Sequence, residues 1–97
     1  MNKTSSELRK MAVVGAGGRV FGTVDEVEIA TDTLRIAALT VRINSEAVEA
    51  LGIKKPFWSH ATLVVHAADV QGITDVVVLR YTIEQFAERL GAAVAQA

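Results

Sequence analysis

The sequence predicts a mainly β protein, a small antiparallel β-barrel with a short inserted helix and a C-terminal helix. Two runs in which apolar and polar residues alternate, near 13–24 and 34–43, are joined by a short segment of turn-forming residues. Such alternation is typical of half-buried strands, and glycines stand where backbones bend or approach closely. The chain is 51% hydrophobic but only 5% aromatic, so we expect a core built from Val, Leu, Ile and Ala.

The chain of 97 residues is expected to form one domain, which is long enough for one modest core. We place the barrel at about 7–82, the C-terminal helix at about 83–91 and a frayed tail at 92–97. No internal repeat or low-complexity linker divides the sequence.

Composition excludes several classes of function. Ten Lys and Arg residues against eleven acidic residues give a net charge of −1, whereas nucleic-acid binding usually needs a basic excess. Without cysteine, neither a disulfide framework nor a thiolate metal site is possible. No apolar run approaches the ~20 residues of a membrane span, and residues 1–6 lack the apolar core of a signal peptide. We therefore expect a cytoplasmic protein with no cofactor and no direct membrane span.

The segment Gly15-Ala16-Gly17 after an apolar run imitates a dinucleotide-binding fingerprint. The third small residue of that fingerprint falls on Val20, and a helix should follow it. Instead, the residues after Gly17 alternate with the period of a strand. The sequence therefore favours a turn between two strands at this point.

The first half of the chain contains three predicted strands. Thr4 and Glu7 form a capping box for a short first turn, after which Leu8 and Met11 tuck under the barrel. The strands are expected at 11–14, 19–29 and 34–43, and the first two are joined by a Gly-Gly turn. Val20 and Val24 share one parity, whereas Val27 and Ile29 share the other, which predicts a β-bulge near 25–26.

The second half continues with a helix and two more strands. Asn44 or Ser45 is expected to cap a helix at 46–51, which Gly52 ends. Strands are expected at 62–66 and 75–81, with a turn or a single helical turn at 67–72. In the segment 82–85, Thr82 and Gln85 complete a second capping box, and Tyr81 and Phe86 have the spacing of a hydrophobic staple.

These residues resemble the PRC-barrel family, which includes the C-terminal domain of the ribosome maturation factor RimM. The first half of the resemblance consists of the strand at 13–14, the Gly17-Gly18 turn, Gly22 before Val24, the acidic strand ending at Asp32, and the strand at 38–41. The second half consists of 64–66, Asp69-Val70, Gly72 and 75–79. Together the two halves cover about 7–82.

The chain departs from the family pattern at two places. Its first turn has Ala16-Gly17-Gly18 in place of Asp-Gly or Asn-Gly, and it inserts a helix followed by the segment 51–58. The insertion resembles the stand-alone archaeal PRC-barrel proteins of cell division, the Cdp type. That resemblance implies self-assembly, association with the membrane-tethered division machinery, and a location at the division site.

His60 and His66 are the only histidines, and Asp69 is the nearest acidic residue in sequence. Because a zinc site needs more ligands than this pair provides, we interpret both histidines as structural or solvent-facing and expect Asp69 to cap the turn that follows it. An acidic edge of the second strand could hold a cation, but solvated residues paired across strands with Arg35 and Arg42 are the favoured interpretation. This edge comprises Asp25, Glu26, Glu28 and Asp32.

The best candidates for a functional surface are Lys54 and Lys55 beside Phe57 and Trp58. Cationic and aromatic residues together suit a protein interface, an anionic headgroup or RNA. The alternative is that both aromatic rings fold back over one end of the barrel and supply the large side chains that the core otherwise lacks.

Apolar residues on both faces of the strand near 76–79 indicate that something covers its outer face. The C-terminal helix could do so, or a second copy of the chain. We hypothesise a homodimer that could extend into a higher assembly, with contacts from Val77, Leu79, Phe86 and Leu90.

These observations predict a non-catalytic, self-associating protein–protein interaction module and no enzyme, because no nucleophile, metal or phosphate motif stands out. The family resemblance adds a role in archaeal cell-division assembly. The alternative is an accessory factor in RNA processing or ribosome maturation, which would resemble the RimM barrel domain.

Overall fold

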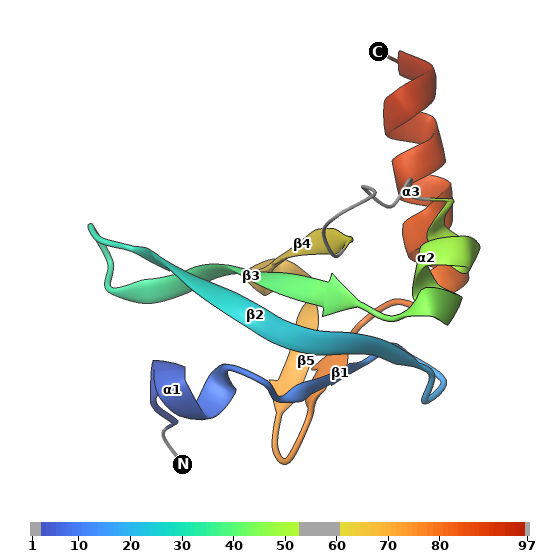
Figure 1. Cartoon of the computed structure of the whole chain (residues 1–97). Helices are drawn as coiled ribbons and strands as arrows, with labels where there is room; N and C mark the ends of the chain where they lie inside the picture. The colour runs from blue at the N-terminus through green and yellow to red at the C-terminus, as the bar shows by residue number, and fades with distance from the viewer. Residues whose placement is uncertain (1–2, 53–60, 97) are drawn as a thin grey trace.

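A computed structural model describes residues 3–52 and 61–96, with only the backbone path from 90 onwards (Figure 1). In chain order, the elements are α1 (Ser5–Leu8), β1 (Ala12–Val14), β2 (Val20–Ala30), β3 (Arg35–Ile43), α2 (Ser45–Leu51), β4 (Thr62–His66), the 3₁₀ turn η1 (Ala67–Asp69), β5 (Val70–Ile73), β6 (Val77–Leu79) and α3 (Ile83–Gln96). The mainly β class and both later helices of the prediction are confirmed.

The strands form one sheet in the order β4-β3-β2-β1-β6-β5. All neighbouring pairs are antiparallel except β1 and β6, which run parallel. The sheet is therefore mixed, and it ends at β4 and β5 without closing. The expected antiparallel barrel is therefore supported only loosely, because the six-stranded sheet is open and one of its pairs is parallel.

The long β2–β3 hairpin contains the predicted bulge. Its register shifts between Val24 and Glu26, and again between Glu28 and Ile29. Gly22 lies so close to β3 that an added Cβ would be 1.9 Å from the Arg42 carbonyl oxygen, which explains the glycine within the strand. A further register shift at Val13/Val14 turns Val20 outward and Phe21 inward, so the predicted inward position of Val20 is wrong.

The prediction also missed one strand. β5 (Val70–Ile73) occupies the segment that we expected to be a turn, and the predicted strand at 75–81 is shortened to β6 (Val77–Leu79). β5 is short, contains Gly72 and pairs with β6 through an irregular register. It forms because β6 offers it a partner, and a local apolar pattern cannot show this.

The helix caps follow the sequence closely. Asn44 Oδ1 accepts from the Ala47 N–H at 2.8 Å, and Gly52 ends α2 in the left-handed conformation. The Thr82 hydroxyl accepts from the Gln85 N–H, and Gln85 Oε1 accepts from the Thr82 N–H. The helix α3 continues to Gln96 rather than ending at 91, because the alanines that follow Gly91 favour helix.

The core lies between the curved sheet, α2 and α3. Its largest fully buried side chains include Phe21, Leu39, Leu79 and Ile83. The Phe86 ring meets the Phe21 ring edge-on at 5.4 Å and the Tyr81 ring edge-on at 5.8 Å, so the predicted staple between Tyr81 and Phe86 is present. These three rings fill the end of the sheet beneath α3.

Candidate functional site

The structure places the predicted interface residues in two groups. Lys54, Lys55, Phe57 and Trp58 fall in 53–60, outside the described residues, as does the side chain of Leu90. The surface hypothesis for these five residues stays a prediction.

Val77, Leu79 and Phe86 belong to the core of the single chain. Val77 and Leu79 are fully buried, and Phe86 is 4% exposed. Side chains that are already buried within one copy cannot also form a contact surface, so the structure moves these three residues from the predicted interface to the core. Phe86 lies on α3, and its ring packs against the Phe21 and Tyr81 rings of the same chain. The homodimer itself stays a prediction, because other surfaces could support it.

An apolar groove opens between β3 and β5, where the sheet fails to close. Its volume is about 330 Å³, and its walls are almost entirely aliphatic, formed by Ile36, Leu39, Ala67, Val70, Gly72 and Ile73. We call it the β3–β5 groove. Strand β4 pairs with β3 only from Ala38 onwards, so the beginning of β3 extends past β4 beside this groove. Among the described residues, no charged side chain lines the groove, which favours an apolar occupant.

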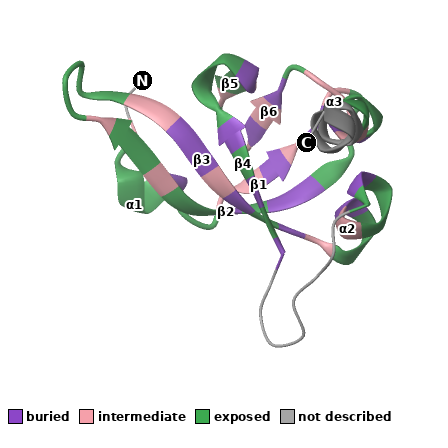
Figure 2. Ribbon diagram, turned by 90° about the horizontal axis from the view of Figure 1, so that it is seen from above, coloured by how far each residue is buried: buried purple, intermediate pink, exposed green. Residues whose placement is uncertain are grey.

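The β2–β3 hairpin continues this apolar surface beyond the sheet. Ile36 of the groove is the cross-strand partner of Ile29, which is 48% exposed, and Leu34 at the turn is 81% exposed. Directly paired residues have side chains on the same face. We call residues 29–35 the hairpin tip. Figures 1 and 2 show it pointing away from α3, at the opposite end of the molecule.

Leu34 has an unusual backbone conformation for its type. Its φ is +59°, the left-handed region that costs a side chain such as leucine about 1–2 kcal/mol and that Gly or Asn occupies readily. The Leu34 N–H donates to the Ala30 carbonyl at 2.7 Å and closes the turn. The turn could therefore form with a smaller or more polar residue, yet a large apolar side chain stands there in solvent.

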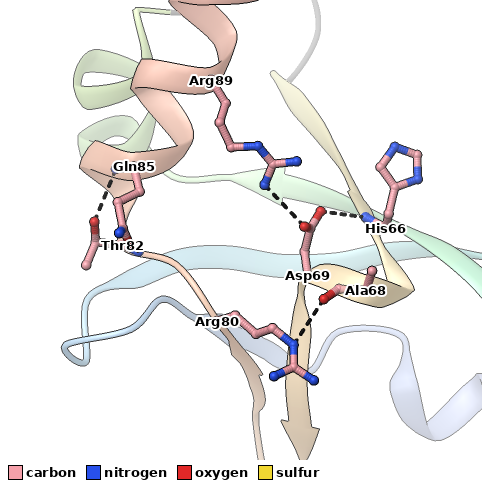
Figure 3. Close-up of polar contacts among 7 residues, drawn as sticks. All are labelled: His66, Ala68, Asp69, Arg80, Thr82, Gln85 and Arg89. Carbon is pink, nitrogen blue, oxygen red and sulfur yellow. Dashed lines mark hydrogen bonds and ion pairs between the residues drawn. The ribbon is translucent and has the colours of Figure 1, made fainter.

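A polar cluster links the sheet to α3 at the other end (Figure 3). The buried Asp69 accepts from the His66 N–H at 3.2 Å and from Arg89 Nη1 at 3.2 Å. The Arg89 guanidinium also lies 5.3 Å from the centre of the Tyr81 ring. Asp69 thus caps the turn that begins at His66 rather than the one after it, which corrects the prediction. The cluster satisfies its own polar groups, so we interpret it as structural.

The remaining predicted candidates that the structure describes are solvated. His66 is exposed, and His60 falls outside the described residues. Asp25, Glu26, Glu28 and Asp32 are all exposed, as expected. Asp25 pairs with Arg42 at 3.9 Å across β2 and β3, whereas Glu26 pairs with Arg9 at 3.1 Å. Within 3–52 and 61–96, no three His, Cys, Asp or Glu side chains gather closely enough to hold a metal ion.

The glycine-rich segment after β1 forms a turn, as predicted. The Gly18 N–H donates to the Gly15 carbonyl, and both Gly17 and Gly18 have positive φ. The chain then enters β2, so the helix that a dinucleotide-binding fingerprint requires directly after its glycines does not follow this turn. None of the helices in the described part of the chain has the length and apolar character needed to cross a bilayer.

The groove and the hairpin tip were not predicted from the sequence. The turn at 31–34 needs a residue with positive φ but contains no glycine. This was the one feature of the sequence that could have indicated the unusual conformation of Leu34. Nothing local indicates the groove, because its walls come from β3 and β5, about thirty residues apart in sequence.

Comparison with known proteins supports the fold. No protein-family model matches the sequence, and no curated protein matches it. Among solved structures, the chain is similar to RimM of Pseudomonas aeruginosa, described as a 16S ribosomal RNA processing protein, with a TM-score of 0.52 over 81% of this chain. The two sequences are 9% identical, and the match spans 43% of the RimM chain, less than half its length. RimM contains a PRC barrel, so the likeness supports a PRC-barrel-like fold for this chain.

Proposed function

We propose that this chain is a non-catalytic interaction module that associates with copies of itself and with other proteins. The observation that supports this most strongly is the apolar surface formed by the β3–β5 groove and the exposed Ile29 and Leu34 of the hairpin tip. Isolated exposed apolar residues are ordinary, but a continuous apolar groove with exposed apolar neighbours is typical of an interaction site.

The proposed cellular role is cell-division assembly in an archaeon, with a cytoplasmic location at the division site. The resemblance of the sequence to stand-alone PRC-barrel proteins of the Cdp type supports this role. The PRC-barrel-like fold is compatible with it, since the module needs only a rigid sheet that presents a contact surface.

The alternative is an accessory factor in RNA processing. Its support is the likeness to RimM, which matches the fold over 81% of this chain. The balanced charge opposes direct RNA binding, so such a factor would act through a protein partner of the ribosome rather than through RNA.

The first test is sedimentation velocity of the purified chain over a range of micromolar concentrations. The proposed self-association predicts a mass that rises with concentration toward a dimer or larger species and changes little with salt, because apolar contacts are weakly screened. A mass that stays at 10.4 kDa at every concentration would contradict self-association.

The partner is tested by affinity capture of the tagged chain from nuclease-treated extracts of its source organism, followed by mass spectrometry. Division or membrane-tethering proteins would support the assembly role, whereas ribosomal proteins or assembly factors would support the RNA-processing alternative. A mock capture with an unrelated tagged protein of the same size is the control. Binding that survives nuclease but falls steeply with added salt would favour an electrostatic partner.

A further inference from the structure

We infer that the hairpin tip and the β3–β5 groove bind each other between two copies of this chain, with Leu34 of each copy inserted into the groove of the other. The inference rests on the proposed self-association and goes beyond it by assigning the surface.

The first argument is the complementarity of the two parts. The groove is lined by aliphatic residues without a charged group, and its volume of about 330 Å³ is at the lower end of small-molecule pockets. It has nothing to orient a polar ligand, but it suits an apolar side chain. The hairpin tip supplies one, since Leu34 is 81% exposed and projects beyond the sheet.

The second argument is the position of the two parts on the chain. Leu34 is two residues from Ile36, which lines the groove. A twofold axis between two copies places Leu34 of each copy opposite the groove of the other. Both contacts therefore form at once, and the dimer is closed. A dimer of this kind uses the same patch twice, as twofold interfaces do.

The third argument is charge complementarity. Asp32 and Arg35 flank Leu34 with opposite charges, and within the described residues neither forms an ion pair. The Asp32 carboxylate accepts only from the neighbouring Thr33 N–H at 2.9 Å. Across the twofold axis, Asp32 of one copy approaches Arg35 of the other, so the charges around the apolar contact attract rather than repel.

The conformation of Leu34 provides a variant that separates folding from association. In Leu34→Asn, the left-handed backbone becomes favourable, so the midpoint of thermal unfolding measured on dilute, monomeric protein should stay the same or rise. The dimer dissociation constant from sedimentation should rise about tenfold or more, as for the loss of a central apolar contact. A purely structural role for Leu34 would not move the two readouts in opposite directions.

The groove is tested with Gly72→Lys. A Cβ at Gly72 meets no atom within 4 Å, so the fold accommodates the change. The variant places a charge at the wall of the groove, and the dimer should weaken as much as in Leu34→Asn. The control is Val20→Thr, which replaces a methyl group by a hydroxyl on another exposed apolar residue, 47% exposed, at the other end of β2. This control should leave the dissociation constant unchanged.

The charge contact is tested by exchange. Asp32→Arg and Arg35→Asp should each weaken the dimer, and the double variant should restore it in part, because the opposite charges then meet again across the axis.

The outcomes distinguish this inference from the proposed function. A wild-type chain that is monomeric at all concentrations would overturn both. A dimer that withstands Leu34→Asn and Gly72→Lys would overturn this surface and leave self-association standing. Weakening by both variants, with Val20→Thr unchanged, supports the surface assigned here.

Discussion

The two ends of the curved sheet differ in how their apolar surface is covered. At one end, α3 lies over the Phe21, Tyr81 and Phe86 rings, and the Asp69–Arg89 pair fastens the helix to η1. At the other end, the β2–β3 hairpin extends past β4 (Figure 2). The β3–β5 groove lies beside the start of β3. The chain thus buries its apolar surface at the α3 end and leaves apolar surface exposed at the hairpin end. We therefore expect substitutions at the α3 end to lower stability and substitutions at the hairpin end to affect the proposed association.

The largest effect is expected from truncating the ring at the centre of the α3 end. Phe86→Ala should lower the free energy of unfolding by about 3–5 kcal/mol, because it removes a buried ring and leaves a cavity between Phe21 and Tyr81. Urea denaturation monitored by circular dichroism measures this loss of stability. If Phe86→Ala unfolds no more easily than the wild type but dissociates a dimer, the ring belongs to an interface and the comparison of the two ends fails.

A matched pair of glycines compares the packing of the closed and open regions. Gly22→Ala should destabilise the fold by about 1–3 kcal/mol or more, because its Cβ would collide with the Arg42 carbonyl oxygen. Gly72→Ala beside the groove should change stability by at most about 0.5 kcal/mol, because its Cβ meets open space. Thermal unfolding of both variants in parallel measures the contrast, and equal losses would contradict it.

A smaller effect on the free energy of unfolding is expected from the Asp69–Arg89 contact between η1 and α3. Asp69→Ala should cost about 1–2 kcal/mol, since the His66 N–H loses its acceptor and Arg89 loses its partner. Arg89→Gln should cost less, because the Arg89 side chain is 52% exposed and its ion pair is screened by solvent. A double-mutant cycle on urea denaturation separates the two contributions. A larger loss for Arg89→Gln than for Asp69→Ala would show that the ion pair, rather than the cap, dominates.

The smallest effect is a pH dependence at α1. Hydrogen bonds from the Thr4 backbone N–H and hydroxyl lower the pKa of Glu7 below its ordinary 4.5. The ionised carboxylate is therefore favoured in the folded state, so the contribution of the cap is complete above the ordinary pKa and is lost as pH falls through the lowered one. Titration of the Glu7 carboxyl carbon by NMR measures the shift. Thr4→Ala is the control: it removes the hydroxyl but keeps the backbone N–H, so it should bring the pKa of Glu7 only part of the way back to its ordinary value.

Much of the fold could be predicted because it follows from local rules. The bounds 62–66 of β4, the Asn44 and Gly52 caps of α2, the bulge near 25–26 and the Thr82–Gln85 capping box are each determined by a few neighbouring residues. The orientation of Val20 was wrong because a one-residue shift opposite Val14 reverses which side chains face inward. β5 was missed because its pairing with β6, not its composition, makes it a strand.

The candidate site could not be predicted, since it depends on where the sheet stops closing. The burial of Val77 and Leu79 depends on the parallel pairing of β6 with β1, which brings distant parts of the chain together. The groove likewise needs β3 and β5 to lie near each other without pairing. Leu34 was placed at the start of a strand, and only the turn geometry reveals its positive φ and its exposure.

The most direct test of the association surface uses the absence of cysteine from the sequence, which allows a single spin label at Thr33→Cys on the hairpin tip. Spin-labelled copies without isotope are mixed with unlabelled, ¹⁵N-enriched copies, so any amide broadening arises between chains. We predict selective broadening of the β5 amides from Val70 to Ile73, which line the groove. Broadening confined to the α3 end in a mixture that dimerises would contradict the account.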